Sequence, residues 1–214
     1  MRIAIIGGTG RLGRPLAARL IVAGYKVAIG SRSKEKAKRA AGLVEKLLAS
    51  YGLSGRPFHG LNREVAEWAD TVIVAVPLEG IGVLGSLKDV VRGKVVISAV
   101  GSVRREGNRL IPVLGGSVAS RIAAELEEAE VAATFHTVSH VRLAKLTERL
   151  RGDVPVFGGG RAVDVAAELV VTVPELRPVY AGPLELSITA EILPALLVAV
   201  SKSLGLNGAS IKFV

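Results

Sequence analysis

Three glycines near the start of the chain have the spacing of a phosphate-binding loop. Gly8, Gly10 and Gly13 form the pattern G-x-G-x-x-G. A β-branched apolar run over residues 2–6 precedes them, and a segment with helical apolar spacing follows them. Free N–H groups at a helix start, together with the helix dipole, attract a diphosphate, so this setting predicts dinucleotide binding. The residues predicted to form this loop are Gly8, Thr9, Gly10, Arg11 and Leu12.

Each glycine of the motif has an expected role. Gly8 would allow a tight turn, Gly10 would let a pyrophosphate approach the backbone, and Gly13 would let the helix pack closely on the strand. The alternative is a glycine-rich turn that binds no ligand. The position of the motif between an expected strand and an expected helix favours the dinucleotide.

The end of the second expected strand indicates which dinucleotide is bound. NAD enzymes carry Asp or Glu at this point to bind the ribose 2′-hydroxyl, whereas this chain has Ser31 and Arg32. Arg can bind a 2′-phosphate through two parallel hydrogen bonds, and hydroxyls of Ser31 and Thr9 can add donors. Lys34 and Lys36 follow, and basic residues are unfavourable in the first turn of a helix unless an anion is near. We therefore predict NADP rather than NAD; an ordinary solvated helix start is the alternative.

The composition limits the class of protein. The 214 residues fit one medium domain, or a main domain with a small appendage, and half of them are hydrophobic. The absence of cysteine excludes disulfides, cysteine metal sites and thiol catalysis, and we expect no bound metal. The net charge is +9, but the basic residues are dispersed and aromatics are only 4%, so we expect no nucleic-acid partner. Without a signal-peptide pattern or a membrane-length apolar run, we expect a cytoplasmic protein.

Apolar runs typical of buried strands alternate with helical segments along the chain. This order predicts an α/β fold, a Rossmann-type doubly wound, mostly parallel sheet with a small C-terminal α+β domain. The expected domains are 1–150, which would bind the dinucleotide, and 151–214, which would cover the cleft. The other expected elements include helices over 33–50, 63–69 with Asn62 as the cap, 82–91, 143–150 and 184–204, an irregular stretch over 104–116, and a final strand over 210–214.

Three more strands should end at the ligand, because ligands in open α/β sheets lie beyond the carboxyl ends of the strands. These strands are expected over residues 71–76, 94–98 and 130–135. Pro77 could instead simply begin the next loop, and His136 could be a structural histidine with satisfied hydrogen bonds. The residues predicted to lie along the ligand at these ends are Val76, Pro77, Gly101, Ser102, His136 and Thr137.

The motifs taken in order resemble those of the archaeal NADPH:F420 oxidoreductases, the deazaflavin-dependent NADP reductases. The resemblance covers nearly the whole chain. It rests on GGTGRLG, on GSRSKEK after the second strand, and on FHTV after a late strand. DVPVFG, AGPL and the terminal IKF follow in the same order. The chain departs from the family pattern at Leu78, at residues 99–102, and at residues 139–140.

The resemblance implies two cofactors, NADP and coenzyme F420, lying face to face in a cleft. By position, Thr9, Ser31, Arg32 and Lys36 match residues that hold the 2′-phosphate. Val76 and Pro77 match the lip along the cofactor, and His136 and Thr137 match the segment beside the nicotinamide. Ser187 and Glu191 fall in the small C-terminal domain that helps to cover the deazaflavin.

Direct hydride transfer between two such rings needs no catalytic acid, base or nucleophile, because the cofactors carry the chemistry. No Ser-His-Asp pattern and no paired catalytic carboxylates stand out, so we predict no catalytic residue, with His136 as a hydrogen-bond donor that positions a ring. The alternatives are an NADPH reductase with another acceptor, such as a flavin, a metal chelate or an imine, and a non-enzymatic NADP-binding protein. The apolar segment 184–204 could serve a homodimer or a core equally well.

Overall fold

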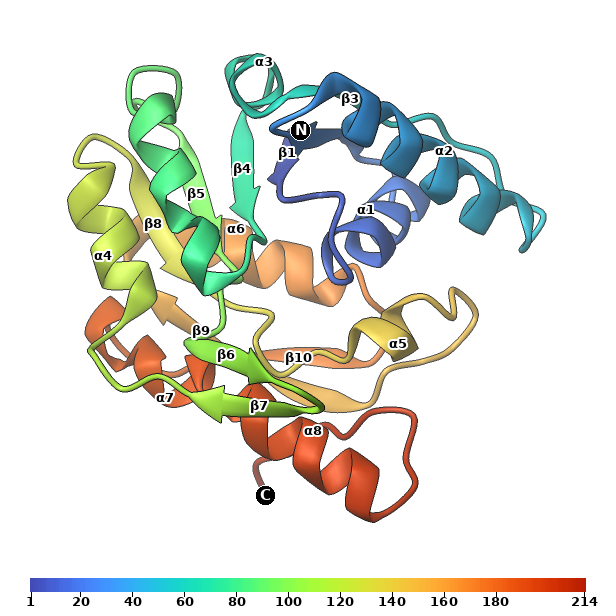
Figure 1. The fold of residues 1–214 in the computed structure, drawn as a ribbon, viewed down its shortest axis with the longest axis vertical. Helices are drawn as coiled ribbons and strands as arrows, with labels where there is room; N and C mark the ends of the chain where they lie inside the picture. The colour runs from blue at the N-terminus through green and yellow to red at the C-terminus, as the bar shows by residue number, and fades with distance from the viewer.

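The computed structural model describes residues 1–214 and contains an eight-stranded sheet with helices on both faces (Figure 1). The strands are β1 (Arg2–Ile6), β2 (Lys26–Ser31), β3 (Phe58–Leu61), β4 (Thr71–Val74), β5 (Val95–Ser98), β6 (Val103–Glu106), β7 (Arg109–Pro112), β8 (Glu130–Ala133), β9 (Gly152–Gly158) and β10 (Leu176–Tyr180). The α-helices are α1 (Gly13–Val22), α2 (Lys34–Ala49), α3 (Asn62–Trp68), α4 (Val118–Glu125), α5 (His140–Leu143), α6 (Gly160–Val171), α7 (Ile188–Glu191) and α8 (Leu193–Ser203). Two 3₁₀ segments, η1 (Leu78–Leu87) and η2 (Leu184–Ser187), complete the chain.

The strand order of the large sheet is β10-β9-β8-β5-β4-β1-β2-β3, and β6 pairs with β7 in a separate hairpin. All neighbours from β3 to β8 are parallel; β9 is antiparallel to β8, and β10 is parallel to β9. The predicted Rossmann-type, mostly parallel sheet is confirmed. The chain order reverses between β1 and β4, and this switch point is where open α/β sheets bind ligands.

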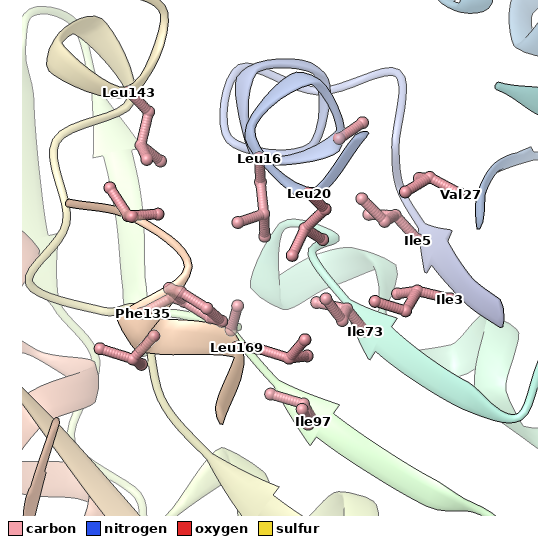
Figure 2. Close-up of a cluster of buried hydrophobic side chains, with 14 of the residues drawn as sticks. Ile3, Ile5, Leu16, Leu20, Val27, Ile73, Ile97, Phe135, Leu143 and Leu169 are labelled. Carbon is pink, nitrogen blue, oxygen red and sulfur yellow. The ribbon is translucent and has the colours of Figure 1, made fainter. Parts of the chain in front are cut away.

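The apolar alternation of the strands divides the core into two layers. Ile3 and Ile5 of β1 belong to the cluster formed with α1, α2 and α6, whereas Ala4 and Ile6 belong to the cluster formed with α3, η1 and α4. Figure 2 shows side chains of α1, Leu16 among them, pointing onto the first of these faces. Because successive side chains of a strand point to opposite faces, a sheet covered on both sides needs continuous apolar strands of this kind.

Two expected elements of the middle region are wrong. The helix expected over 82–91 is the 3₁₀ segment η1, which lies earlier and contains Gly80, Gly82 and Gly85. Glycine disfavours a regular α-helix because it loses more backbone freedom than other residues. The stretch expected to be irregular over 104–116 holds the β6–β7 hairpin, whose base is closed by hydrogen bonds between Ser102 and Val113.

The helix expected over 143–150 is also wrong, because α5 ends at Leu143. Arg19 of α1 is buried, and its guanidinium donates to the carbonyl oxygens of Leu143, Lys145 and Glu148 at 3.0, 2.6 and 3.0 Å. Carbonyls that accept from this guanidinium are held in turns rather than in a regular helical ladder. A single residue distant in sequence therefore shapes the segment that follows α5.

The expected helix over 184–204 is divided into η2, α7 and α8. Pro194 stands at the start of α8, where its missing N–H favours a new helix start over a continuous helix. By length and composition, Leu184–Ser203 is long and apolar enough to cross a membrane, with a mean hydropathy of 1.7. Glu191 lies within this stretch and is fully buried against α4.

The C-terminal segment has no final strand, contrary to expectation, but it is held against the sheet. The N–H of Asp153 donates to the Ile211 carbonyl at 2.8 Å, and the Asp153 carboxylate accepts from the N–H of Phe213 at 2.6 Å. The boundary expected at residue 150 lies between β8 and β9, which are hydrogen-bonded neighbours in one sheet. The division into domains 1–150 and 151–214 stays a prediction.

Candidate functional site

The glycine loop after β1 is tightly packed against the loop after β4. Gly7 has φ +79°, and a Cβ at this position would lie 2.7 Å from the carbonyl oxygen of Ala75. Gly7 is therefore the left-handed residue of the loop, whereas Gly8 lies in the tight turn closed by the hydrogen bond from the Gly10 N–H to the Gly7 carbonyl at 2.9 Å. Gly8 also packs on β1, where a Cβ would lie 2.9 Å from the oxygen of Ile5.

The other two glycines of the motif differ in what surrounds them. A Cβ on Gly13 would lie 2.6 Å from the Cα of Gly8, so the close packing expected between helix and loop is present. A Cβ on Gly10 would meet the oxygen of Gly7 at 3.1 Å and otherwise nothing closer than 3.8 Å. The space beside Gly10 is consistent with the approach of a ligand to the backbone, which stays a prediction.

The start of α1 leaves backbone donors without protein partners. Leu12 precedes the helix and provides no side-chain cap, and no acidic residue lies in the first turn. The backbone N–H groups of Thr9, Arg11 and Leu12 donate no hydrogen bond within the protein. Unpaired N–H groups at a helix N-terminus form an anion site, because they point outward and the dipole is positive there.

The end of β2 places hydroxyl and cationic groups beside this loop. Ser31 is buried at the strand end and its Oγ accepts from the N–H of Ser33 at 3.3 Å. Arg32 and Lys36 are exposed, and neither side chain forms a hydrogen bond or ion pair within the protein. Lys34 differs, because its Nζ lies 2.6 Å from Oε1 of Glu64. Two of the three basic residues noted in the sequence are therefore available to an anion.

The loop after β4 forms the facing lip. A Cβ at Gly7 would lie 2.8 Å from Cγ1 of Val76, so the two loops are in contact. Val76 is half-buried and Pro77 is exposed. The structure thus brings Val76 and the glycine loop together at the switch point, while Pro77 directly precedes η1.

Asn62 is a polar residue at the same edge whose position was not expected. It is the first residue of α3 rather than its cap; Oε2 of Glu64 accepts from the N–H of Leu61 at 2.9 Å instead. Its side chain is buried beside Gly30, and its Oδ1 has no hydrogen-bond partner. Asn62 is predicted from the sequence only as a cap; its place directly after β3 is the one local feature that could have indicated the edge of the sheet.

His136 follows β8 and is buried with both ring nitrogens unpartnered. Burial lowers the pKa of His136 well below its ordinary value, although the nearby carboxylate of Glu191 opposes this effect. The imidazole is therefore neutral at pH 7, with one N–H donor and one acceptor nitrogen. A buried polar ring without partners is rare, and it is consistent with a ligand that supplies them.

Other predicted residues of this region have their polar groups bonded within the protein. The hydroxyl of Thr137 donates to the Asp153 carbonyl at 3.2 Å, and the N–H of Ser102 donates to the Glu191 carbonyl at 2.8 Å. A Cβ at Gly101 would lie 3.3 Å from the same Glu191 oxygen. Close packing against α7 accounts for this glycine without a ligand.

Ser187 and Glu191 are fully buried at the start of α4. The carboxylate of Glu191 accepts from the N–H groups of Val118 and Ala119 at 2.7 and 2.9 Å, and from the Ser187 hydroxyl at 2.7 Å. A carboxylate at a helix N-terminus satisfies the free donors there and complements the dipole. These two residues join η2 and α7 to α4, and both are fully buried.

An open parallel sheet with a glycine-rich first turn and Ser31 and Arg32 at the second strand end defines a Rossmann-type dinucleotide-binding protein. Residues 2–101 match the family model described as NADP oxidoreductase, coenzyme F420-dependent. The chain belongs to this family, because its relatives are more than 30% identical over nearly its full length.

Two relatives illustrate the match. The F420-dependent NADP reductase of Methanothermobacter marburgensis is 34% identical, over 99% of this chain and 97% of that protein. The F420-dependent NADP reductase of Methanocaldococcus jannaschii is 32% identical, again over 99% of this chain and 97% of the relative. The predicted family is therefore confirmed.

Solved structures share the fold at lower identity. A putative F420-dependent NADP reductase from Arthrobacter sp. is 22% identical with a TM-score of 0.83, covering 100% of this chain and 99% of that one. An imine reductase from Bacillus cereus is 17% identical with a TM-score of 0.64, covering 95% of this chain and 62% of that one. At these identities the likeness concerns the fold alone.

Proposed function

We propose that this protein transfers a hydride directly between NADP(H) and the deazaflavin coenzyme F420. The observation that supports NADP is the unpaired Arg32 beside a glycine loop with free N–H donors. The relatives named F420-dependent NADP reductases support the second cofactor. The nicotinamide and deazaflavin rings supply the hydride chemistry when bound, and the chain supplies proximity and orientation.

The residues of this chain have distinct proposed tasks. The N–H groups of Thr9, Arg11 and Leu12 would bind the diphosphate, with Gly10 leaving room for it and Gly8 allowing the close packing of the loop on β1. The 2′-phosphate would be held by Arg32 and Lys36 with hydroxyls of Ser31 and Thr9, because charge-assisted bonds to phosphate are strong. The lip of the groove would be formed by Val76 and Pro77. Further along the edge, Gly101 and Thr137 would shape the site by packing.

His136 would position a ring by hydrogen bonding rather than by proton transfer. Its neutral N–H can donate to a carboxamide or ring carbonyl, because burial keeps the imidazole uncharged at pH 7. Replacing His136 with Gln keeps a donor, whereas Leu removes it. We expect His136→Leu to lower the kcat for reduction of F420 by NADPH, while the affinity for NADPH is unchanged. His136→Gln should restore part of the lost kcat. Equal kinetics in both variants would exclude this role.

The function is tested by mixing purified protein with NADPH and F420. Loss of the deazaflavin absorbance together with NADPH oxidation is expected, and with NADPH replaced by NADH the rate should fall sharply. The reverse reaction, with reduced F420 and NADP, provides an independent measurement. The proposal is contradicted if neither the forward nor the reverse reaction is detected at any pH at which the protein is folded.

A second acceptor class is favoured by one specific observation. The resemblance implies other residues than those at 99–102 and 139–140, of which the first segment follows β5 and the second begins α5. NADPH oxidation measured with a flavin, a metal chelate and an imine separates this alternative from the first. Tight NADP binding with no turnover for any acceptor would indicate a binding protein instead.

We also propose that α8 pairs two copies of this chain in the cytoplasm. None of the α8 residues is buried, although the helix is strongly apolar, and Leu196 is 57% exposed. Exposed apolar faces of this kind often mark protein interfaces. Sedimentation of the wild type and of Leu196→Glu tests the pairing: the wild type should sediment as a dimer and the variant as a monomer, whereas identical masses would contradict it.

A further inference from the structure

A surface hollow of about 340 Å³ lies between the start of α1, the outer face of α2 and α5. Its polar side chains are all basic: Arg11, Arg14 and His140. No acidic residue lines it. The remaining lining is apolar and consists of Pro15, Leu43, Leu47, Val141 and Ala144.

A fourth basic group, from the hairpin, faces the same place. Burial lowers the pKa of His140 below its ordinary value, and the positive charges of Arg11 and Arg105 lower it further. Both guanidiniums therefore lie within electrostatic reach of this ring. In Figure 1 the β6–β7 hairpin and α5 lie on the same side of the molecule as the first turn of α1. Neither Arg11 nor Arg105 forms a hydrogen bond or ion pair with its side chain in the protein.

The neighbouring arginine of the hairpin behaves differently. Arg104 points to the other face of the hairpin, since successive strand residues alternate, and its Nη2 lies 2.7 Å from Oε1 of Glu106. Like charges brought together without a carboxylate cost free energy, and an anion removes this cost. Two guanidiniums and an imidazole with a lowered pKa thus converge from three separate elements, beside an apolar base, and none of the three side chains has a hydrogen-bond partner in the protein.

We propose that Arg11, Arg105 and His140 form a subsite for the acidic tail of the deazaflavin substrate, and this rests on the proposed function. Coenzyme F420 carries a phosphodiester and γ-linked glutamates on its ribityl chain. Guanidiniums bind phosphate and carboxylate groups through paired hydrogen bonds, and the apolar base accommodates the methylene groups of the tail. Arg11 lies at the glycine loop, so the subsite begins next to the proposed cofactor groove.

The experiment compares the tailed coenzyme with its tail-free ring system, the 8-hydroxy-5-deazaflavin that carries only the ribityl chain. For the wild type we expect a KM at least about tenfold lower for the tailed form, with similar kcat. Arg105→Gln should raise the KM for the tailed form about tenfold and leave the tail-free KM, the kcat and the NADPH KM unchanged. His140→Gln should have a smaller effect of the same kind.

Arg104→Gln is the matched control, because it removes the same charge from the same strand while leaving Arg105 in place. Equal KM values for tailed and tail-free substrate in the wild type, or equal effects of the two arginine variants, would overturn the proposal. Inorganic phosphate, added as an inhibitor, tests whether the subsite recognises the tail. If phosphate inhibits the reduction of the tailed and the tail-free substrate to the same degree, the proposal is also overturned. If F420 and the tail-free deazaflavin are both reduced with the same KM, the proposed function stands and the subsite proposal fails. If neither compound is reduced, both proposals fail.

Discussion

At the ends of β1 and β2 the polar groups have few protein partners, whereas at the ends of β5 and β8 most of them are bonded within the protein. Three N–H groups of the glycine loop and the side chain of Arg32 have no partner in the first region. In the second region Ser102, Thr137 and Glu191 all hold distant parts of the chain together. His136 is the exception there, because both of its ring nitrogens are unpartnered.

The difference separates a surface arranged for a ligand from one arranged for assembly. The free N–H donors of the first region come from residues close together in sequence, so they are a property of one strand–turn–helix unit. The second region is built by contacts between residues about 70 positions apart, such as Glu191 with Val118. We infer that nucleotide binding and attachment of the C-terminal segment can be perturbed separately, and the predictions below are arranged to test this.

The largest effect is expected for Gly13→Val in the first region. Its Cβ would lie 2.6 Å from the Cα of Gly8 and 2.9 Å from the oxygen of Gly7, and backbone atoms cannot move aside cheaply. We expect a loss of about 3 kcal/mol in unfolding free energy and loss of measurable NADPH binding, because the loop must shift. Urea unfolding and calorimetric titration measure the two effects.

Gly42→Ala in α2 is the control for that variant. A Cβ there meets nothing within 4 Å, so we expect a gain of about 0.5–1 kcal/mol from improved helix propensity. Unchanged NADPH affinity in Gly13→Val would show that the packing of the loop is not needed for the ligand.

The second prediction concerns the assembly region. Glu191→Gln removes the charge that the N–H groups of Val118 and Ala119 face, and it places amide hydrogens against donors. We expect a loss of about 2–3 kcal/mol in unfolding free energy, since buried donors without acceptors are costly, with NADPH affinity of the remaining folded protein unchanged. Glu185→Gln, on an exposed side chain of η2, should leave stability unchanged. A fall in NADPH affinity beyond the loss of folded protein would contradict the separation of the two regions.

The sequence predicted the first region well and the second poorly, for the same reason. The strand, the glycine turn and the Ser33 cap of α2 depend on neighbours within a few residues, and the periodic pattern contains this information. The turns after α5 depend on Arg19, about 125 residues earlier, and no local pattern could reveal this. The same is true of Glu191, whose carboxylate could not be assigned to α4 from spacing alone.

Some local patterns were also misleading. The apolar run after Pro77 has helical spacing, yet its glycines favour the 3₁₀ segment η1. Pro194 was included in a long helix although proline begins helices more readily than it continues them. Arg32 and Lys34 looked equivalent in the sequence, but only Lys34 has an acidic neighbour, Glu64, from another element.

The third prediction tests Arg32 directly. Arg32→Asp replaces an unpaired cation by an anion at the proposed 2′-phosphate position, so NADPH affinity should fall by about 30-fold or more, corresponding to about 2 kcal/mol. NADH affinity should change little, because NADH has a 2′-hydroxyl. Arg39→Asp makes the same change in net charge on an exposed position of α2 and is the control. If both variants weaken NADPH equally, the effect is one of overall charge and the assignment of Arg32 is wrong.

The smallest effect is expected from acid, and it compares one carboxylate from each half of the chain. Hydrogen bonds from Arg177 and from the N–H of Phe213 lower the pKa of Asp153 to about 2, and those from Arg2 lower the pKa of Asp70 to about 2. Each folded pKa lies below the unfolded value near 4, so the unfolded chain binds more protons in that interval. The stabilisation is complete above about pH 4 and is lost as the pH falls toward 2.

The two carboxylates should differ in how much they matter. The Asp70 side chain is 47% exposed, so solvent and salt screen its pair with Arg2, whereas the Asp153 side chain is 3% exposed and also holds the C-terminal segment. We expect Asp153→Asn to flatten the acid dependence of the urea midpoint between pH 4 and 2 more than Asp70→Asn. Amide exchange at Phe213 should rise in the Asp153 variant alone. If Asp70→Asn instead flattens the acid dependence of the urea midpoint more, the expectation is wrong. Acid would then act first on the Arg2–Asp70 pair, which joins β1 to the start of β4, and the N-terminal part of the sheet would limit stability in acid.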